Sequence, residues 1–180
     1  KILSLKELIG QASEGQVNLE QATILVGRDE FSQAMVLARA AENNFSFLAD
    51  ELGRMKNNRL ANRLPLVMNQ LNGLESLLVA ARFLSQAVYS GANFGQGLKI
   101  FSQGDRKLNF SEFSPAEKRQ VLGKIFESAP ELNGIKADLD LAYFSLNQAK
   151  VFNSFFPLQE KIAQTKKQIA EARKILEKTI

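Results

Sequence analysis

The sequence has 180 residues, of which 45% are hydrophobic and 23% are charged, and this composition is typical of one soluble domain. It contains no His and no Cys, which excludes zinc sites of the Cys/His type, thiol nucleophiles, Ser-His-Asp triads and haem ligated by His. The formal net charge of +4 is too small for us to expect a nucleic-acid partner. No run of about 18 apolar residues occurs, so no segment is expected to span a membrane.

Apolar residues recur at alternating steps of three and four through residue 55, which predicts two amphipathic helices. The first stripe consists of Leu5, Leu8, Ala12, Gly15, Leu19, Ala22 and Val26. The second consists of Phe31, Ala34, Ala38, Ala41, Phe45, Leu48, Leu52 and Met55. We expect Gly27 to end the first helix in a left-handed conformation and Asp29 to cap the second. Because the turn between them is so short, the two helices should be antiparallel neighbours.

A third helix is expected to begin at Pro65, because the residue before a proline disfavours helical geometry. Its stripe consists of Val67, Leu71, Leu74, Leu78, Ala81 and Val88, with a weaker continuation through Phe94, Leu98 and Phe101. Residues 102–113 show no clean period and predict the longest loop. Ser114-Pro115-Ala116-Glu117 then predicts a helix start, with Ser as the cap and Glu reaching back to the cap amide.

The rest of the sequence predicts a broken fourth helix and a last helix. The fourth stripe consists of Val121, Leu122, Ile125, Leu132, Ile135, Leu139, Ala142 and Leu146. Pro130 lies inside it, so we expect a kink or break near residues 126–130, where Ser128 and Glu131 could restart the helix. The last stripe consists of Leu158, Ile162, Thr165, Ile169, Ala172 and Leu176. We therefore predict an all-α fold: an elongated antiparallel helical bundle of four main helices, one of them kinked or broken near Pro130.

Two groups of side chains are predicted to form the core. The first group lies on the stripes of the second and third helices and consists of Phe31, Phe45, Leu48, Leu52, Leu71, Leu74 and Leu78. The second group consists of the later phenylalanines, Phe83, Phe94, Phe101, Phe126, Phe144, Phe152, Phe155 and Phe156. These aromatics are most simply core residues. A small ligand pocket lined by them is the alternative.

The strongest charge feature is a run of cations with no acidic residue between Glu51 and Glu75. It consists of Arg54, Lys56, Arg59 and Arg63. Such a cluster is a candidate anion-binding site for phosphate-rich polymer or lipid headgroups. The alternative is that cations collect at the C-terminal end of a helix because the macrodipole favours them there.

The sequence predicts no catalytic residue, cofactor or metal site. Asp138 and Asp140 are two residues apart, so on a helix they point in different directions and form no dyad by themselves. A carboxylate-bridged metal pair in a bundle normally needs Glu-x-x-His, which is absent here. The glycines from Gly91 to Gly97 precede no Lys-Ser/Thr pair and follow no strand, so they predict no phosphate-binding loop. Close approach of two helices is their ordinary explanation.

Several segments together resemble a known helical region. They are Asn18-Leu19-Glu20-Gln21-Ala22, Asp29-Glu30-Phe31-Ser32-Gln33-Ala34, Ala38-Arg39-Ala40-Ala41-Glu42-Asn43-Asn44-Phe45, Leu64-Pro65-Leu66-Val67 and Leu77-Leu78-Val79-Ala80-Ala81. In this order they resemble the helical region of bacterial proteins that carry Domain of Unknown Function 4012. The resemblance covers nearly the whole chain.

The resemblance implies a layout with a short cytoplasmic start, one membrane helix, this helical region outside the cell membrane, and then the named domain. That downstream domain is not in this sequence, so no functional residue is carried over. The implied location is extracytoplasmic, anchored to the bacterial cell membrane by an adjacent helix upstream. The chain begins at Lys1 rather than Met. We therefore expect residues 1–180 to be a single helical-bundle domain excised from a longer membrane-anchored protein.

The expected function is a non-catalytic stalk or interaction module of a membrane-anchored cell-envelope protein. Two alternatives stay open. One is a ligand-sensing helical bundle resembling chemoreceptor sensor domains, and the other is an accessory domain that binds anionic cell-envelope polymer. A pocket ringed by convergent polar groups would favour sensing, whereas a filled core with a one-sided basic pole would favour polymer binding.

Overall fold

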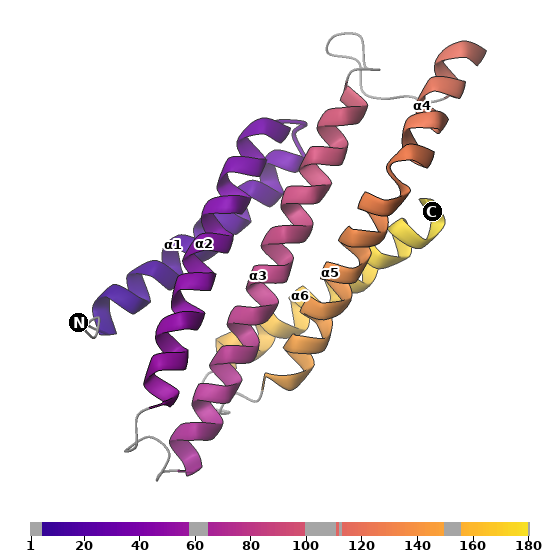
Figure 1. Ribbon diagram of the computed structural model, residues 1–180. Coiled ribbons are helices and arrows are strands. Elements are labelled where there is room, and N and C mark those ends of the chain that lie inside the picture. Colours follow the sequence, from indigo (N-terminus) through magenta and orange to yellow (C-terminus); the bar gives the residue numbers. More distant parts are fainter. Residues whose placement is uncertain (1–4, 58–64, 100–110, 112, 150–155, 180) are drawn as a thin grey trace.

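The computed structural model describes residues 5–57, 65–99, 111, 113–149 and 156–179, and Figure 1 shows their arrangement. Six helices and no strand are found in these residues, which confirms the all-α prediction. The helices are α1 (Leu5–Val26), α2 (Phe31–Lys56), α3 (Pro65–Lys99), α4 (Pro115–Glu127), α5 (Ala129–Gln148) and α6 (Phe156–Thr179).

The expected count of four main helices is not confirmed. α4 and α5 together correspond to the helix that was expected to break near Pro130, since α4 ends at Glu127 and α5 begins at Ala129. Pro130 lies in the first turn of α5, where its missing N–H costs no helical hydrogen bond. Even with α4 and α5 counted as one broken helix, the described residues form five helices rather than four.

Two pairs of packed helices, α2 with α3 and α5 with α6, run in opposite directions. Between α2 and α3, low residue numbers of one helix meet high numbers of the other. The hydrogen bonds that show this run from Gln96 to Ser32 (3.2 Å), from Gln86 to Glu42 (2.8 Å) and from Lys56 to Glu75 (2.5 Å). Two ion pairs show that α5 and α6 are antiparallel as well: Lys136 with Glu177 (3.2 Å) and Asp140 with Arg173 (2.6 Å).

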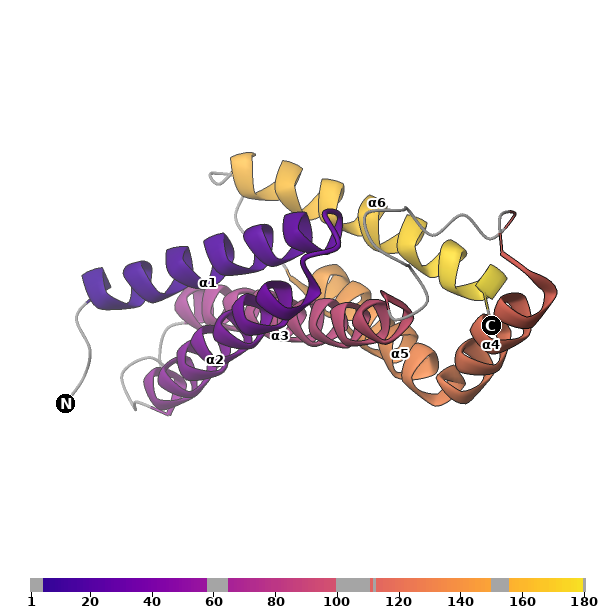
Figure 2. The same ribbon diagram turned by 90° about the horizontal axis from the view of Figure 1, so that it is seen from above.

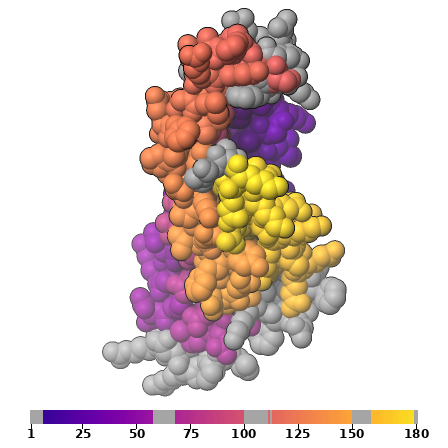
Figure 3. Space-filling model, turned by 90° about the vertical axis from the view of Figure 1, so that its right-hand side faces the viewer, coloured from indigo at the N-terminus to yellow at the C-terminus, as the bar shows by residue number. Residues whose placement is uncertain are grey.

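The helices form two layers. In the view from above, α2, α3 and α5 lie in a row, and α1 and α6 cover the same side of that row (Figure 2). α4 continues past α5 and forms one end of the molecule (Figure 3). α3, with 35 residues, is the longest helix described. It lies between α1 and α2 on one side and α5 and α6 on the other (Figure 2).

The core is divided into two clusters on different sides of α3. One joins α3 to α5 and α6 and is centred on Ala80, Ala87, Leu132, Ile135, Leu139, Ala142, Leu146 and Ile169. The other joins α1, α2 and α3 around Ala41, Phe45 and Leu48. The predicted stripes explain this division, because each helix presents its apolar side to its neighbours. Among the described helices, α3 alone contributes side chains to both clusters.

The turn between α1 and α2 differs from the prediction in its left-handed residue. This residue is Asp29, with φ of 61°, and not Gly27. The Glu30 amide donates to the Leu25 carbonyl (3.0 Å) and the Asp29 amide to the Val26 carbonyl (3.2 Å), which is the Schellman pattern that ends many helices. The N-cap residue of α2 is Glu30 rather than the predicted Asp29, and no side chain makes a capping hydrogen bond there. Asp tolerates left-handed geometry better than most residues, so it fills the place usually taken by glycine.

The start of α4 confirms the predicted capping box. The Glu117 amide donates to the Ser114 hydroxyl (3.3 Å), and the Ser114 amide donates to the Glu117 carboxylate (2.7 Å). Hydrogen bonding with Ser114 lowers the pKa of the Glu117 carboxyl, chiefly through the Ser114 hydroxyl and then through its backbone amide. The start of α3 at Pro65 also agrees with the prediction.

Four of the seven predicted core residues of α2 and α3 are buried: Phe45, Leu48, Leu52 and Leu71. Phe31 and Leu78 are half-buried. Leu74 is 43% exposed, so that part of the prediction is wrong. Leu74 precedes Glu75, whose partner Lys56 is the last residue of α2. This turn of α3 lies near the end of the α2–α3 contact, but Leu71 one turn earlier is buried, so Leu74 is exposed because no neighbouring helix covers its side of α3.

Two of the predicted core aromatics are on the surface instead. Phe126 is 81% exposed and Phe144 is 61% exposed. Phe144 lies two residues from both Ala142 and Leu146, which face the core. A step of two residues turns a helical side chain by about 200°, so Phe144 must point outward. Phe83 and Phe94 do pack against the α3–α5–α6 cluster, whereas the predictions for Phe101, Phe152, Phe155 and Phe156 concern side chains outside the described part of the chain.

Candidate functional site

The predicted basic cluster is only partly within the described residues. Arg54 pairs with Glu51 (2.5 Å) on the same helix, and Lys56 pairs with Glu75 (2.5 Å) on α3. Arg59 and Arg63 lie outside the described residues. Two of the four cations thus bind the carboxylates that flank the run in the sequence. Anion binding by the cluster stays a prediction.

The two carboxylates of α5 serve different neighbours. Asp140 binds Arg173 of α6 (2.6 Å). Asp138 lies on another side of α5, where burial raises the pKa of its carboxyl and the charge of Glu42 on α2 raises it further. In the described part of the chain, no three His, Cys, Asp or Glu side chains are grouped so that they could hold a metal ion.

A polar cluster joins α2 to α3. Arg39 pairs with Glu42 (2.7 Å), which also accepts a hydrogen bond from Gln86 (2.8 Å). The Arg39 guanidinium lies 4.5 Å from the centre of the Tyr89 ring. Its pKa is raised first by a hydrogen bond with Tyr89 and then by the charge of Glu42. Because these groups bind one another across the two helices, the cluster serves to hold α2 and α3 together.

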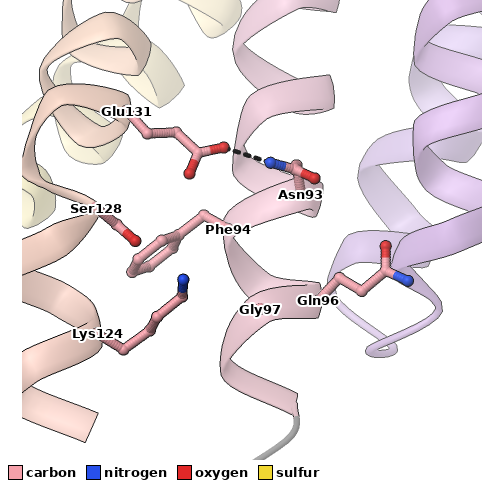
Figure 4. Close-up of a pocket in the computed structure, with 7 residues that line it drawn as sticks. All are labelled: Asn93, Phe94, Gln96, Gly97, Lys124, Ser128 and Glu131. Atoms are coloured by element: carbon pink, nitrogen blue, oxygen red, sulfur yellow. Dashed lines mark hydrogen bonds between the residues drawn. The ribbon is translucent and has the colours of Figure 1, made fainter.

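A polar pocket of about 300 Å³ lies between the C-terminal half of α3 and the junction of α4 and α5 (Figure 4). Its lining consists of Asn93, Phe94, Gln96, Gly97, Lys124, Ser128 and Glu131. The break between α4 and α5 places Lys124 and Ser128 on one side of it and Glu131 above them. The α3 helix supplies the opposite wall.

The contacts of the lining residues divide them into two kinds. The Asn93 side-chain amide donates to the Glu131 carboxylate (2.6 Å) and so ties α3 to α5. Gln96 turns away toward α2 and donates to the Ser32 hydroxyl (3.2 Å). Lys124, Ser128 and Phe94 instead converge on one space (Figure 4). These three, with Glu131, are the groups that a bound molecule would meet.

This pocket was not predicted from the sequence. The local signals beside it are the glycines of α3 and the break at Pro130, which by themselves predict close helix packing and a kink. Gly95 does mark close packing, because a Cβ there would lie 2.5 Å from the Phe31 ring of α2. Gly97 has a different role: a Cβ would lie 3.6 Å from Cε of Lys124, so the glycine leaves space beside the lysine stem.

A second hollow of about 370 Å³ lies between the end of α5 and the start of α6. Its lining consists of Leu146, Asn147, Ala149, Gln159, Ile162, Ala163 and Lys166. It adjoins residues 150–155, which the structure does not describe, and we therefore build no site on it.

Comparisons with protein-family models, with curated proteins and with solved structures found no match to this chain. The resemblance to the helical region of proteins with Domain of Unknown Function 4012 therefore stays a prediction. Within the described residues, each helix is too short or too polar to cross a bilayer.

Proposed function

We propose that this chain is a non-catalytic spacer or interaction module, in which the long helices form an elongated antiparallel bundle. The proposed setting is the outer side of the bacterial cell membrane, with the anchor supplied by a membrane helix upstream. The resemblance described above supports this setting. The proposed partner is a protein, and the exposed aromatic rings of Phe126 and Phe144 support a surface that contacts one.

The observation that carries the spacer role is the large surface of the molecule. Its accessible surface is 11917 Å² for a mass of 20.0 kDa. A compact monomer of this mass exposes about 8,700 Å². An elongated bundle has such an excess, because few helices surround each one. At about 1.5 Å per residue, α3 alone would extend for about 52 Å.

The location can be tested with a single introduced thiol, because the chain has no Cys of its own. In intact cells that produce the natural protein with Asn133→Cys, a maleimide that cannot cross membranes should label this exposed position of α5. Ala142→Cys on the same helix is the matched control, since Ala142 is fully buried and should not react in the folded protein. Labelling of Asn133→Cys only after cell lysis would contradict the extracytoplasmic location.

Ligand sensing is a second candidate function, and the pocket beside Lys124 favours it. Polar groups from three helices converge there, which is the feature expected of a sensing bundle.

Binding of anionic envelope polymer or lipid headgroups is a third proposal and depends on Arg59 and Arg63. Co-sedimentation with anionic vesicles across a salt series tests it. Binding at low salt that disappears on changing Arg54, Lys56, Arg59 and Arg63 to Gln would support it. No binding at low salt would contradict it.

A further inference from the structure

The pocket between α3 and the α4–α5 junction contains opposite charges that do not pair with each other. Lys124 lies on the α4 wall and Glu131 in the first turn of α5. Neither takes part in the ion pairs found among the described residues. In Figure 4 the Phe94 ring and the Ser128 side chain lie between them. The two charges are therefore held apart, and both border the same space.

The end of the pocket beside Lys124 and Ser128, which is the lower end in Figure 4, is suited to an anionic group. Ser128 is 7% exposed and occupies the position before α5, yet its side chain makes no capping hydrogen bond. Its φ of −87° and ψ of 3° differ from the extended geometry that a capping serine needs. The hydroxyl points instead toward the pocket, on the same side as the Lys124 ammonium (Figure 4). The positive end of the α5 dipole and the negative end of the α4 dipole meet at Ser128 and offset each other, so the attraction for an anion comes from Lys124 and the Ser128 hydroxyl.

The opposite end of the pocket, beside Glu131, is suited to a cationic group. The Glu131 carboxylate accepts a hydrogen bond from the Asn93 amide (2.6 Å), which fixes its position against α3. An acceptor-only carboxylate has capacity for further donors, and an ammonium group is a strong donor to it. Between the two ends, the half-buried Phe94 ring offers an apolar surface.

We propose that this pocket binds a small zwitterion, specifically a free amino acid. The ligand carboxylate would receive hydrogen bonds from Lys124 and Ser128, and its ammonium group would donate to Glu131. The ligand's side chain would lie against Phe94. A volume of about 300 Å³ is sufficient for a molecule of this size. This site rests on the pocket alone and is independent of the spacer role, and it gives the proposed sensing function a ligand class.

Ligands with a single charge fit the pocket less well. A simple anion on Lys124 would lie near the Glu131 carboxylate, and a simple amine on Glu131 would lie near the Lys124 ammonium. In each case one like charge repels the ligand and one charged group of the pocket stays unpaired. A zwitterion satisfies both groups at once.

The test is an NMR titration of the 15N-labelled chain with each of the common amino acids, up to about 10 mM. We expect at least one of them to shift the backbone amides of Phe94, Ser128 and Glu131. Its deaminated acid and its decarboxylated amine, which each lack one charge, should bind about tenfold more weakly or worse. The proposal is overturned if no amino acid shifts these amides, or if either single-charge analogue binds as tightly.

Variants assign the binding to the proposed groups. Lys124→Met keeps the stem beside Gly97 but removes the charge, and Glu131→Gln keeps an oxygen that can accept from Asn93. Each should weaken binding about tenfold. Lys174→Met, at an exposed position of α6, is the matched control and should bind as the natural chain does. Unchanged binding in both Lys124→Met and Glu131→Gln would overturn the proposal.

A third variant tests the site without removing a charge, so that a loss of binding can be separated from a loss of folding. Gly97→Leu leaves every charge in place and places a side chain beside the Lys124 stem, in the space of the pocket. It should abolish binding while the helical circular dichroism is unchanged. Full binding in a folded Gly97→Leu chain would contradict the assignment of the ligand to this space.

Discussion

At the scale of single residues, the sharpest contrast is between aromatic side chains that look alike in the sequence. Phe45 is buried in the cluster between α1, α2 and α3, whereas Phe144 is 61% exposed. Phe45→Ala should lower the free energy of unfolding by about 3 to 5 kcal/mol, because it leaves a cavity. Phe144→Ala should change it by about 0.5 kcal/mol or less. Urea titrations of both variants measure this, and equal losses would contradict the described core.

Two glycines of α1 should respond to alanine in opposite directions. A Cβ on Gly15 would lie 2.9 Å from the Phe45 ring and 3.3 Å from Cβ of Asn44, whereas a Cβ on Gly10 would have no neighbour within 4 Å. Gly10→Ala should stabilise the chain by about 0.5 to 1 kcal/mol, since alanine is the better helix former. Gly15→Ala should destabilise it by about 1 to 2 kcal/mol, because overpacking outweighs that gain. Thermal unfolding measures this: the melting temperature should rise in Gly10→Ala and fall in Gly15→Ala.

Asp138 predicts a pH dependence of stability. Burial and the charge of Glu42 raise the pKa of its carboxyl in the folded chain above the ordinary value. The folded state therefore retains this proton to higher pH than the unfolded state does. The Asp138 contribution to stability is greatest below the unfolded pKa and falls as the pH rises through the raised folded pKa. Asp138→Asn should thus be more stable than the natural chain at pH 7, and this advantage should shrink in acid. An advantage that grows toward low pH would contradict the sign.

At the scale of elements, α4 depends strongly on its cap. The Ser114–Glu117 capping box is its main local stabilisation, because α4 forms the end of the molecule and packs chiefly on α5. Ser114→Ala should cost about 1 kcal/mol and speed the hydrogen exchange of amides in the first turn of α4. Ser13→Ala, inside α1 and exposed, is the control and should not slow or speed exchange in α4.

The same cap should respond to acid. Hydrogen bonds from Ser114 lower the pKa of Glu117, so its contribution is present above the unfolded pKa and is lost as the pH falls through the lowered folded pKa. The protection factors of the first turn of α4, which compare the measured exchange with the intrinsic rate at each pH, should therefore fall in acid in the natural chain. The same fall in Glu117→Gln would show that another group is responsible.

Helix starts and ends were predictable where the signal is local. Pro65, the capping box at Ser114 and the break near Pro130 each follow from the geometry of a few adjacent residues, and the structure places helix ends there. The turn after α1 was mispredicted because glycine is the usual left-handed residue, and Asp29 takes that role here. Nothing in the neighbouring sequence decides between Gly27 and Asp29, since both tolerate this geometry.

At the scale of the whole molecule, spacing predicted which side of a helix is apolar but not how much of it is covered. Leu74 and Phe126 show this, since exposure depends on which sides of a helix its neighbours cover. The candidate pocket has the same limitation. Asn93 and Glu131 are 38 residues apart, and their contact follows only from the packing of α3 against α5. No pattern within a single helix predicts that pairing.

The most direct test of the proposed elongated bundle is small-angle X-ray scattering of the 20.0 kDa monomer. A compact chain of 180 residues has a radius of gyration of about 16 Å. We expect a clearly larger radius, with a maximum dimension no shorter than the roughly 52 Å spanned by the 35 residues of α3. The mass from the same scattering curve confirms that the monomer is measured. A monomer with a radius of gyration of about 16 Å would contradict the elongated bundle and, with it, the spacer role.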